Sequence, residues 1–223
     1  RGYGLKGGAS PFARRLPLIV TGAIFVLLFA VASRLYDGFL SARVFVSLLS
    51  DNAFLGIAAV GMTLVIFSGG IDLSVGAVIG FTSIFTATLI ERHQLAPGVA
   101  WVLALAAGTG LGLGMGALIQ VYRLPPFLIT LAGMFLARGA GFWIGTDSVG
   151  IGHDWYARIS GYELELGSVT VPANALILLV VLLAGYVTAH HTRFGRTLLA
   201  IGGNEQSALL MGLPIGSTKM AVY

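Results

Sequence analysis

Residues Asn52–Ile90 read NAFLGIAAVGMTLVIFSGGIDLSVGAVIGFTSIFTATLI, and Asp72 is the only charged side chain among them. A continuous helix from Ala53 to Ile90 would be about 57 Å long at 1.5 Å per residue, too long for one crossing of a hydrocarbon core about 30 Å thick. Gly69 and Gly70 are expected to break this helix and to free backbone groups beside the carboxylate. The stretch therefore predicts two membrane spans and a short link that holds an acid at or within the membrane.

The whole chain has the composition of a membrane protein. Of its 223 residues, 57% are hydrophobic and only 10% are charged, and the mean hydropathy is +0.91. A soluble domain carries roughly 25% charged residues, so lipid is the expected solvent and an all-α, polytopic transmembrane helical bundle is the expected fold. The scattered Lys and Arg form no basic stripe, which disfavours a nucleic-acid partner, and the absence of cysteine excludes disulfides and thiolate metal sites.

Six stretches can each supply the roughly 17 to 25 apolar residues that a membrane crossing needs. They are Leu16–Ser33, Asn52–Ile71, Leu73–Ile90, His93–Tyr122, Phe127–Ile144 and Leu166–Thr192. The first run could be a signal sequence, but no convincing small-residue cleavage site follows it, so we treat it as a retained span. A further apolar run starts at Met220–Tyr223. The expected transmembrane domain, residues 16–223, is therefore incomplete at its C-terminal end.

Positive charges predict the orientation, because cytoplasmic loops carry an excess of Lys and Arg. With the N-terminal tail, residues 1–15, in the cytoplasm, eight of them face inward and four outward. The inner set is Arg1, Lys6, Arg14, Arg15, Arg123, Arg193, Arg196 and Lys219, and the outer set is Arg34, Arg43, Arg92 and Arg158. The same orientation places the acidic loop Asp147–Val171 on the outer side.

The densest polar signal is the link between the two spans of the opening stretch. Its candidate residues for a translocation pathway or a helix break are Ser68, Gly69, Gly70, Asp72 and Ser74. Broken helices are tolerated in membranes where protein or a water-filled cavity satisfies the freed backbone, which points to a transport path. The simpler interpretation is that Asp72 caps the next helix beside Ser74, and direct contact with a substrate stays open.

Arg138 is the second charge inside an apolar run. It lies about 17 Å along a helix that starts at Phe127, and a charge at mid-span costs on the order of 2.5 to 3.5 kcal/mol on insertion scales. It therefore needs a partner or an aqueous exit. Pairing with Asp72 is one solution, and an interhelical structural role is favoured over ligand binding.

Glycines and motifs further along the chain favour packing over chemistry. Gly108, Gly112 and Gly116 recur every fourth residue, as Gly76 and Gly80 do, which predicts helix faces that let backbones approach closely. The sequence has no P-loop, no His-Glu-x-x-His zinc motif and no Gly-x-Ser-x-Gly elbow. We therefore expect no catalytic residue, no metal site and no cofactor in this chain.

The last inner segment, Thr192–Lys219, contains a candidate short helix. Asn204 can cap it, and Gly212 and Pro214 can terminate it. This helix would display Ala208, Leu209 and Met211 beside polar residues. From the pattern alone, a partner-binding helix and an ordinary turn between spans are both open.

Several strings together resemble the permease subunits of ribose-type sugar ABC importers. They are Asp51–Gly56 (DNAFLG), Gly61–Ile66 (GMTLVI), Ser68–Gly76 (SGGIDLSVG), Ile129–Met134 (ITLAGM) with Arg138 and Gly139, Thr192–Gly195 (TRFG) and Ala200–Asn204 (AIGGN). The resemblance runs in the same order over nearly the whole chain from Leu16 onward. Asp51–Gly56 and Leu210–Gly212 favour the galactofuranose permease subgroup within that family.

The resemblance implies a bacterial inner-membrane permease without ATPase activity. Its partners would be a cytoplasmic ABC ATPase, a second permease copy or paralogue, a periplasmic sugar-binding protein and a monosaccharide such as galactofuranose or a ribose-like sugar. It also implies that residues 203–214 form a coupling helix that docks on the ATPase. That role is carried onto Gly203, Asn204, Glu205, Ala208, Met211, Gly212 and Pro214, beside the exposed Leu209 of the same helix.

Two other function classes remain as rivals to an ABC permease. A secondary active transporter or channel would use Asp72 and Arg138 to couple ions to transport. An intramembrane enzyme is the more remote class, because the chain offers no recognisable pair of nucleophile and base.

Overall fold

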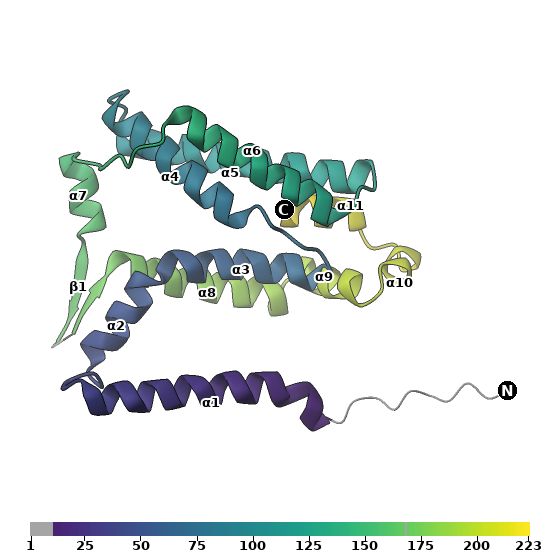
Figure 1. Cartoon of the computed structure of the whole chain (residues 1–223). Coiled ribbons are helices and arrows are strands. Elements are labelled where there is room, and N and C mark those ends of the chain that lie inside the picture. The colour runs from purple at the N-terminus through teal and green to yellow at the C-terminus, as the bar shows by residue number, and fades with distance from the viewer. Residues whose placement is uncertain (1–10, 168) are drawn as a thin grey trace. The chain divides into compact units, whose positions relative to one another are not determined.

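The computed structural model describes residues 11–167 and 169–223, and these described residues fall into two compact units that meet between Ser47 and Leu48. The elements are α1 (Pro11–Leu35), α2 (Ala42–Asp51), α3 (Ala53–Phe67), α4 (Val75–Glu91), α5 (Pro97–Val121), α6 (Pro126–Ile144), α7 (Asp154–Ser160), β1 (Glu163–Leu166), β2 (Val169–Pro172), α8 (Ala173–His191), α9 (Arg193–Gly203), α10 (Glu205–Leu210) and α11 (Ile215–Val222). Figure 1 shows them along the chain. The expected all-α fold class is confirmed, with one short hairpin as its only described sheet.

The first unit is built on α1, which has 25 residues and therefore extends about 37 Å, enough to cross a membrane. Its large apolar side chains are exposed, for example Leu18 and Phe25, as expected of a helix surrounded by lipid. Phe29 holds the unit together, since its ring centroid lies 4.9 Å from that of Phe39 and 5.2 Å from that of Phe45.

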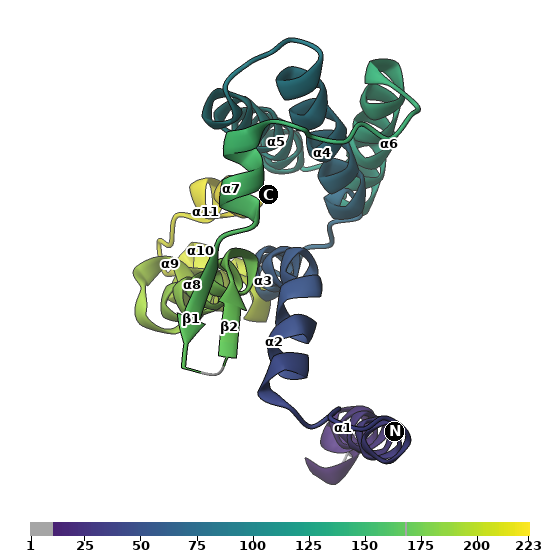
Figure 2. The same cartoon turned by 90° about the vertical axis from the view of Figure 1, so that its left-hand side faces the viewer.

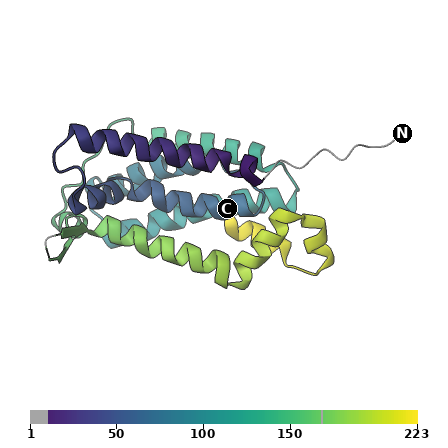
Figure 3. The ribbon, with the colours of Figure 1, turned by 90° about the horizontal axis from the view of Figure 1, so that it is seen from below.

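The second unit packs α3 against α8 and packs α4 against both α5 and α6 (Figures 1 and 3). Glycines allow the close approach of α3 and α8, because a side chain at Gly56 would collide with Leu178 and one at Gly185 with Val60. Gly133 of α6 leaves the same kind of space for Met115 of α5.

A hairpin and a short helix close one end of the second unit (Figure 2). Strands β1 and β2 pair antiparallel, with Glu163 opposite Pro172. The expected span Leu166–Thr192 was therefore wrong at its start, since α8 begins only at Ala173. The β-branched residues Val169, Thr170 and Val171 favour a strand, and Pro172 supplies the fixed backbone angle that suits the residue before a helix.

Within the described residues, four helices are long and apolar enough to span a membrane: α1 from Arg15, α5, α6 and α8. The pair α2 and α3, separated by Asn52, passes the same test together as a broken span. Helix α4 is apolar but shorter, at 17 residues or about 25 Å. The expected count of about six spans is compatible with these helices.

The other end of the second unit is formed by α9, α10 and α11. Thr192 caps α9 by accepting a hydrogen bond at Oγ1 from the amide of Gly195, at 3.1 Å. Ile201, Ala208 and Ile215 then form a small apolar core with one residue from each of the three helices. This core fixes the turn between α9 and α11, which projects from the end of the unit (Figures 1 and 3).

Candidate functional site

The link between α3 and α4 breaks the helix as the sequence predicts. Gly69 has φ +73°, a left-handed conformation that glycine adopts without strain, and its amide donates to the carbonyl of Ile66 at 2.9 Å. The hydroxyl of Ser68 donates to the carbonyl of Val65 at 2.6 Å. These bonds satisfy the end of α3 and let the chain turn towards α4 at residues 70–74.

Asp72 orders the start of α4. Its Oδ1 accepts hydrogen bonds from the amide and from the hydroxyl of Ser74, both at 2.7 Å, and Ser74 is buried. Since Ser74 directly precedes the first residue of α4, the carboxylate fixes where the helix begins rather than bonding the amides of its first turn. This contact is local. Among the described residues, no side chain donates a hydrogen bond to the other carboxylate oxygen of Asp72.

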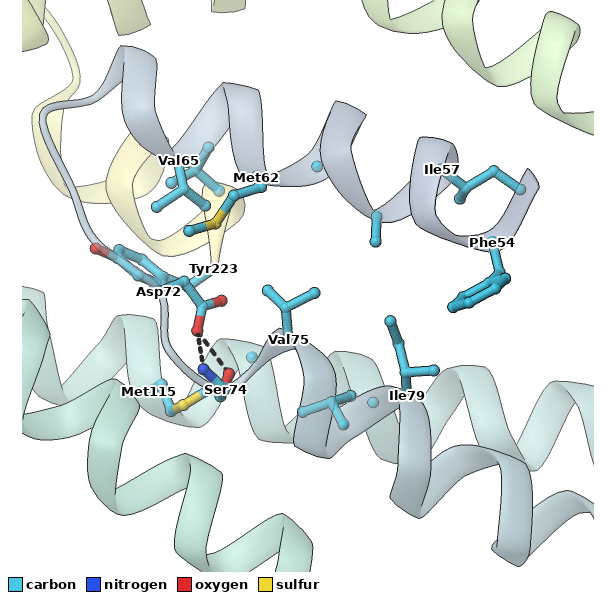
Figure 4. A pocket seen from close by; sticks show the side chains of 16 residues that line it. Phe54, Ile57, Met62, Val65, Asp72, Ser74, Val75, Ile79, Met115 and Tyr223 are labelled. Carbon is cyan, nitrogen blue, oxygen red and sulfur yellow. Dashed lines mark hydrogen bonds between the residues drawn. The ribbon is translucent and has the colours of Figure 1, made fainter. Parts of the chain in front are cut away.

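Asp72 also reaches a cavity of about 450 Å³ between α3, α4, α5 and α11 (Figure 4). The lining is apolar apart from this carboxylate and a few hydroxyl groups, and it includes the thioethers of Met62 and Met115. Tyr223 lies beside the acid, with its hydroxyl donating to the carbonyl of Ile71 at 3.5 Å. Asp72 is therefore the single charge in the lining of an apolar cavity, and its role in a transport path stays a prediction.

The link is close to the candidate coupling segment. Ser68, Gly69 and Gly70 line a small cavity of about 350 Å³ together with Gly202 and Glu205. A side chain at Gly202 would collide with the carbonyl of Phe67, so α9 touches the end of α3 directly. The structure therefore brings together two residue sets that are more than 100 positions apart in the chain.

The candidate coupling helix is formed as α10. Asn204 caps it, accepting from the amide of Ser207 at 2.8 Å, and Gly212 ends the turn with φ +73°. An ion pair of 2.7 Å joins Glu205 to Lys219 of α11, and it is the only salt bridge within the described residues. Pro214 directly precedes α11, as the expected termination requires.

One expected exposure on this helix is wrong. Ala208 is fully buried in the small core with Ile201 and Ile215, because a six-residue helix has only one inward side and Ala208 occupies it. Leu209 and Met211 are exposed as predicted, and Leu210, for which no exposure was predicted, is 90% exposed. We call Leu209–Met211 the apolar turn.

Arg138 does not pair with Asp72, which corrects the pairing considered from the sequence. The described residues contain no salt bridge of Arg138, and this exposed side chain lies in a separate cavity of about 330 Å³ between α4 and α6. Thr130, which the sequence reasoning missed, instead connects α6 to the link. Its buried hydroxyl donates to the carbonyl of Pro126 at 2.9 Å and lies 3.4 Å from that of Ile71.

The glycine faces divide into two cases. Gly108 of α5 faces Thr82 and Val78 of α4, and Gly112 and Gly116 face the α11 end of the chain, so their packing role is confirmed. Gly76 and Gly80 of α4 line the cavity between α4 and α6, and no described atom lies within 4 Å of a Cβ added at either position.

Comparison with known proteins shows the family of this chain. The family of permease components of branched-chain amino acid transport systems matches residues 44–223. The chain belongs to this family. Individual relatives confirm the expected resemblance to sugar importer permeases. No solved structure matches the chain.

Three relatives cover nearly all of the chain. It is 46% identical to the inner membrane ABC transporter permease protein YjfF of Escherichia coli (strain K12), over 94% of this chain and 64% of that protein. It is 37% identical to the fructose import permease protein FruG of Bifidobacterium longum (strain NCC 2705), over 98% and 66% respectively. It is 38% identical to the ribose import permease protein RbsC of Bacillus subtilis (strain 168), over 88% and 61%. The chain thus spans slightly less than two thirds of the length of these relatives.

Proposed function

We propose that this chain is a permease subunit of a bacterial ABC importer that carries a monosaccharide across the inner membrane. The observation that carries the proposal is the similarity to permeases named for fructose and ribose import, which extends over 88% to 98% of the chain. Hydrolysis of ATP takes place on a separate cytoplasmic ATPase. A second permease copy or paralogue and a periplasmic sugar-binding protein complete the importer, and galactofuranose or a ribose-like sugar is its substrate.

The apolar turn Leu209–Met211 is the contact with the ATPase. Three consecutive large apolar side chains exposed at the end of a helical unit are best explained by a groove that buries them, as partner proteins bury amphipathic helices. The capped α10 and the Glu205–Lys219 ion pair hold the turn in place. Gly203, Gly212 and Pro214 contribute by setting where α10 begins and ends.

The contact between α9 and the link connects this docking site mechanically to the membrane-spanning helices. Because Gly202 packs on the carbonyl of Phe67, a displacement of α9 by the ATPase displaces the end of α3 and, through Ser68–Gly70, the segment that carries Asp72. Asp72 in turn fixes the start of α4 and faces the apolar cavity. The link is therefore the element through which nucleotide state changes the transport path.

A secondary carrier that couples ions through Asp72 and Arg138 has less support. The two side chains line different cavities, and no ion pair joins them within the described residues. A relay of charge between them would need a group that lies between the two cavities.

The test is reconstitution of the full permease with its ATPase and binding protein in liposomes, followed by uptake of labelled D-ribose, D-fructose, D-galactose and L-leucine. We expect uptake of a sugar that requires ATP and stops when the ATPase is left out. Uptake driven by a proton gradient without ATP would establish the secondary carrier instead. ATP-driven uptake of leucine alone would replace the sugar by an amino acid.

A further inference from the structure

A second cavity of the larger unit, of about 810 Å³, lies between α4, α5 and the segment that leads into α7. It is separate from the apolar turn and from the link, and its volume falls within the range of about 300 to 1,000 Å³ that small-molecule sites occupy. Its lining differs in chemistry from that of the Asp72 cavity. Beside aliphatic side chains it has two aromatic rings and several hydroxyl groups, and no charged residue is part of it.

Aromatic side chains form one wall of this cavity. Trp101 of α5 and Tyr156 of α7 line it, with ring centroids 6.1 Å apart. Trp155 packs on the same indole at 5.5 Å, so the orientation of Trp101 is supported from α7. A half-buried indole that faces a cavity offers a flat apolar surface, which suits the carbon–hydrogen face of a sugar ring.

Hydroxyl groups from α4 and α5 form another part of the wall. Thr82 and Thr86 of α4 donate to the carbonyls of Val78 and Thr82, both within 2.8 Å, so their oxygens can serve a ligand only as acceptors. Ser83 and Thr109 also line it, and neither makes a side-chain hydrogen bond to the part of the chain that the structure describes. These two can both donate and accept. The wall thus matches the alternating donors and acceptors of a sugar's hydroxyl rim.

The absence of charge from the lining selects between ligand classes. An amino acid carries an ammonium and a carboxylate, and burying either charge without a partner is strongly unfavourable. A monosaccharide has no charge and needs only the aromatic surface and the hydroxyls. The lining therefore fits a neutral polyol and not the zwitterion that the family's description suggests.

The segment that completes the cavity is fixed in place. The carboxylate of Glu91, the last residue of α4, accepts a hydrogen bond from the amide of Gly152 at 2.6 Å. His153 then caps α7 by accepting from the amide of Trp155 at 3.2 Å. These bonds hold Val149, Ile151 and Tyr156 over the space between α4 and α5, so the site is preorganised.

We infer that this cavity is a sugar-binding site of the permease, in which Trp101 stacks on the sugar ring and the hydroxyls of α4, Thr109 and Tyr156 bind its rim. The inference rests on the proposed function and deepens it, because it names the site where the permease itself recognises its substrate. Val78 and Gly108 line both cavities, so this site adjoins the Asp72 cavity.

Tryptophan fluorescence tests binding. The chain has three tryptophans, and Trp143 is 92% exposed and outside the cavity. In the full permease in lipid nanodiscs, every tryptophan except Trp101 is replaced by phenylalanine, Trp143 and Trp155 included, and the remaining emission of Trp101 is titrated with D-ribose, D-fructose, D-galactose and L-leucine. We expect a saturable change with at least one sugar and none with leucine. Adding Thr109→Val should weaken this binding at least fivefold, because it removes a hydroxyl that no internal bond uses.

The matched control is Thr88→Val on α4, since that hydroxyl is buried, lies outside the cavity and has no partner among the described residues. It should leave binding within twofold. In the reconstituted importer, Trp101→Ala should lower the maximal sugar uptake rate at least fivefold, Trp101→Phe should restore most of it, and Trp143→Ala should leave it unchanged. ATP-driven sugar uptake at the parental rate in Trp101→Ala overturns the site and leaves the proposed function standing. A fluorescence response to leucine, or to none of the compounds, also overturns the site whatever the importer carries.

Discussion

The two cavities of the larger unit share α4 and α5 but differ in chemistry. The cavity beside the link is apolar with a single carboxylate, Asp72. The link in turn lies beside α9, the helix that leads into α10 and the apolar turn. The one beside α7 has no charge and is rich in hydroxyls and aromatic rings. If the two proposals hold, recognition and coupling lie at opposite ends of the same helices. Changes at the link should therefore affect energy coupling, while changes beside α7 should affect which substrate is recognised.

The largest effect is expected from Met211→Arg, which acts on the coupling end. The apolar turn would place a charge in the ATPase groove, and a charge buried without a partner costs several kcal/mol on an order-of-magnitude scale. The full permease should reach the membrane, lose the ATPase on purification and stop importing sugar.

Ser217→Arg is the control for Met211→Arg. It adds the same charge to an exposed position of α11 at the same end of the unit, and it should keep both the ATPase and uptake. Copurification of the ATPase with Met211→Arg together with normal uptake would remove the coupling role of the apolar turn.

A neighbouring pair of glycines tests the contact between α9 and the link. Gly202→Ala places a methyl group against the carbonyl of Phe67, whereas Gly203→Ala points into open space. Overpacking of this kind costs about 1 to 3 kcal/mol, so Gly202→Ala should lower the melting temperature of the purified permease and uncouple ATP hydrolysis from transport. Gly203→Ala should change stability by less than about 1 kcal/mol. Equal melting temperatures and equal coupling in the two variants would show that the contact is not needed.

Asp72→Asn separates the charge of the link from its geometry. An asparagine oxygen can still accept from the amide and hydroxyl of Ser74, so the start of α4 should survive with a loss of about 1 kcal/mol or less. We expect sugar uptake to fall severalfold while ATPase binding and the fluorescence response of Trp101 stay normal. Uptake at the parental rate in a variant that assembles normally would show that the charge has no part in transport.

Local patterns in the sequence predicted much of this architecture. The glycine break at 68–70, the Asn204 cap, the Gly212 terminus and the Gly108–Gly116 packing face all depend on residues within one or two helical turns, which is why spacing revealed them. Two of the errors came from contacts between helices. Burial of Ala208 depends on Ile215, and the separation of Arg138 from Asp72 depends on how α6 packs.

The α7 cavity could not be predicted from spacing for the same reason. Its hydroxyls lie on α4 and α5, and its Tyr156 follows a loop that only the bond from Gly152 to Glu91 brings into place. Thr82, Thr86 and Thr109 read in sequence as ordinary polar residues in apolar helices. Only the fold shows that they face one space with Trp101.

The smallest functional effect is expected from two single-cysteine variants, and labelling them shows which side of the membrane each cavity faces. The positive-inside pattern predicts that the hairpin next to α7 is periplasmic and that α11 is cytoplasmic. The chain has no cysteine, and Thr170 of β2 and Ser217 of α11 are both exposed, so each can be replaced without removing a buried contact. Both variants should transport at close to the parental rate.

In intact cells whose outer membrane has been made permeable, an impermeant thiol reagent should label Thr170→Cys and not Ser217→Cys, and both should be labelled after the inner membrane is opened. With that result the sugar-binding cavity faces the side where a periplasmic binding protein delivers its sugar, and the apolar turn faces the ATPase. The reverse labelling would place the uncharged cavity on the cytoplasmic side, where it could serve only in release, and would separate the apolar turn from the compartment that contains ATP.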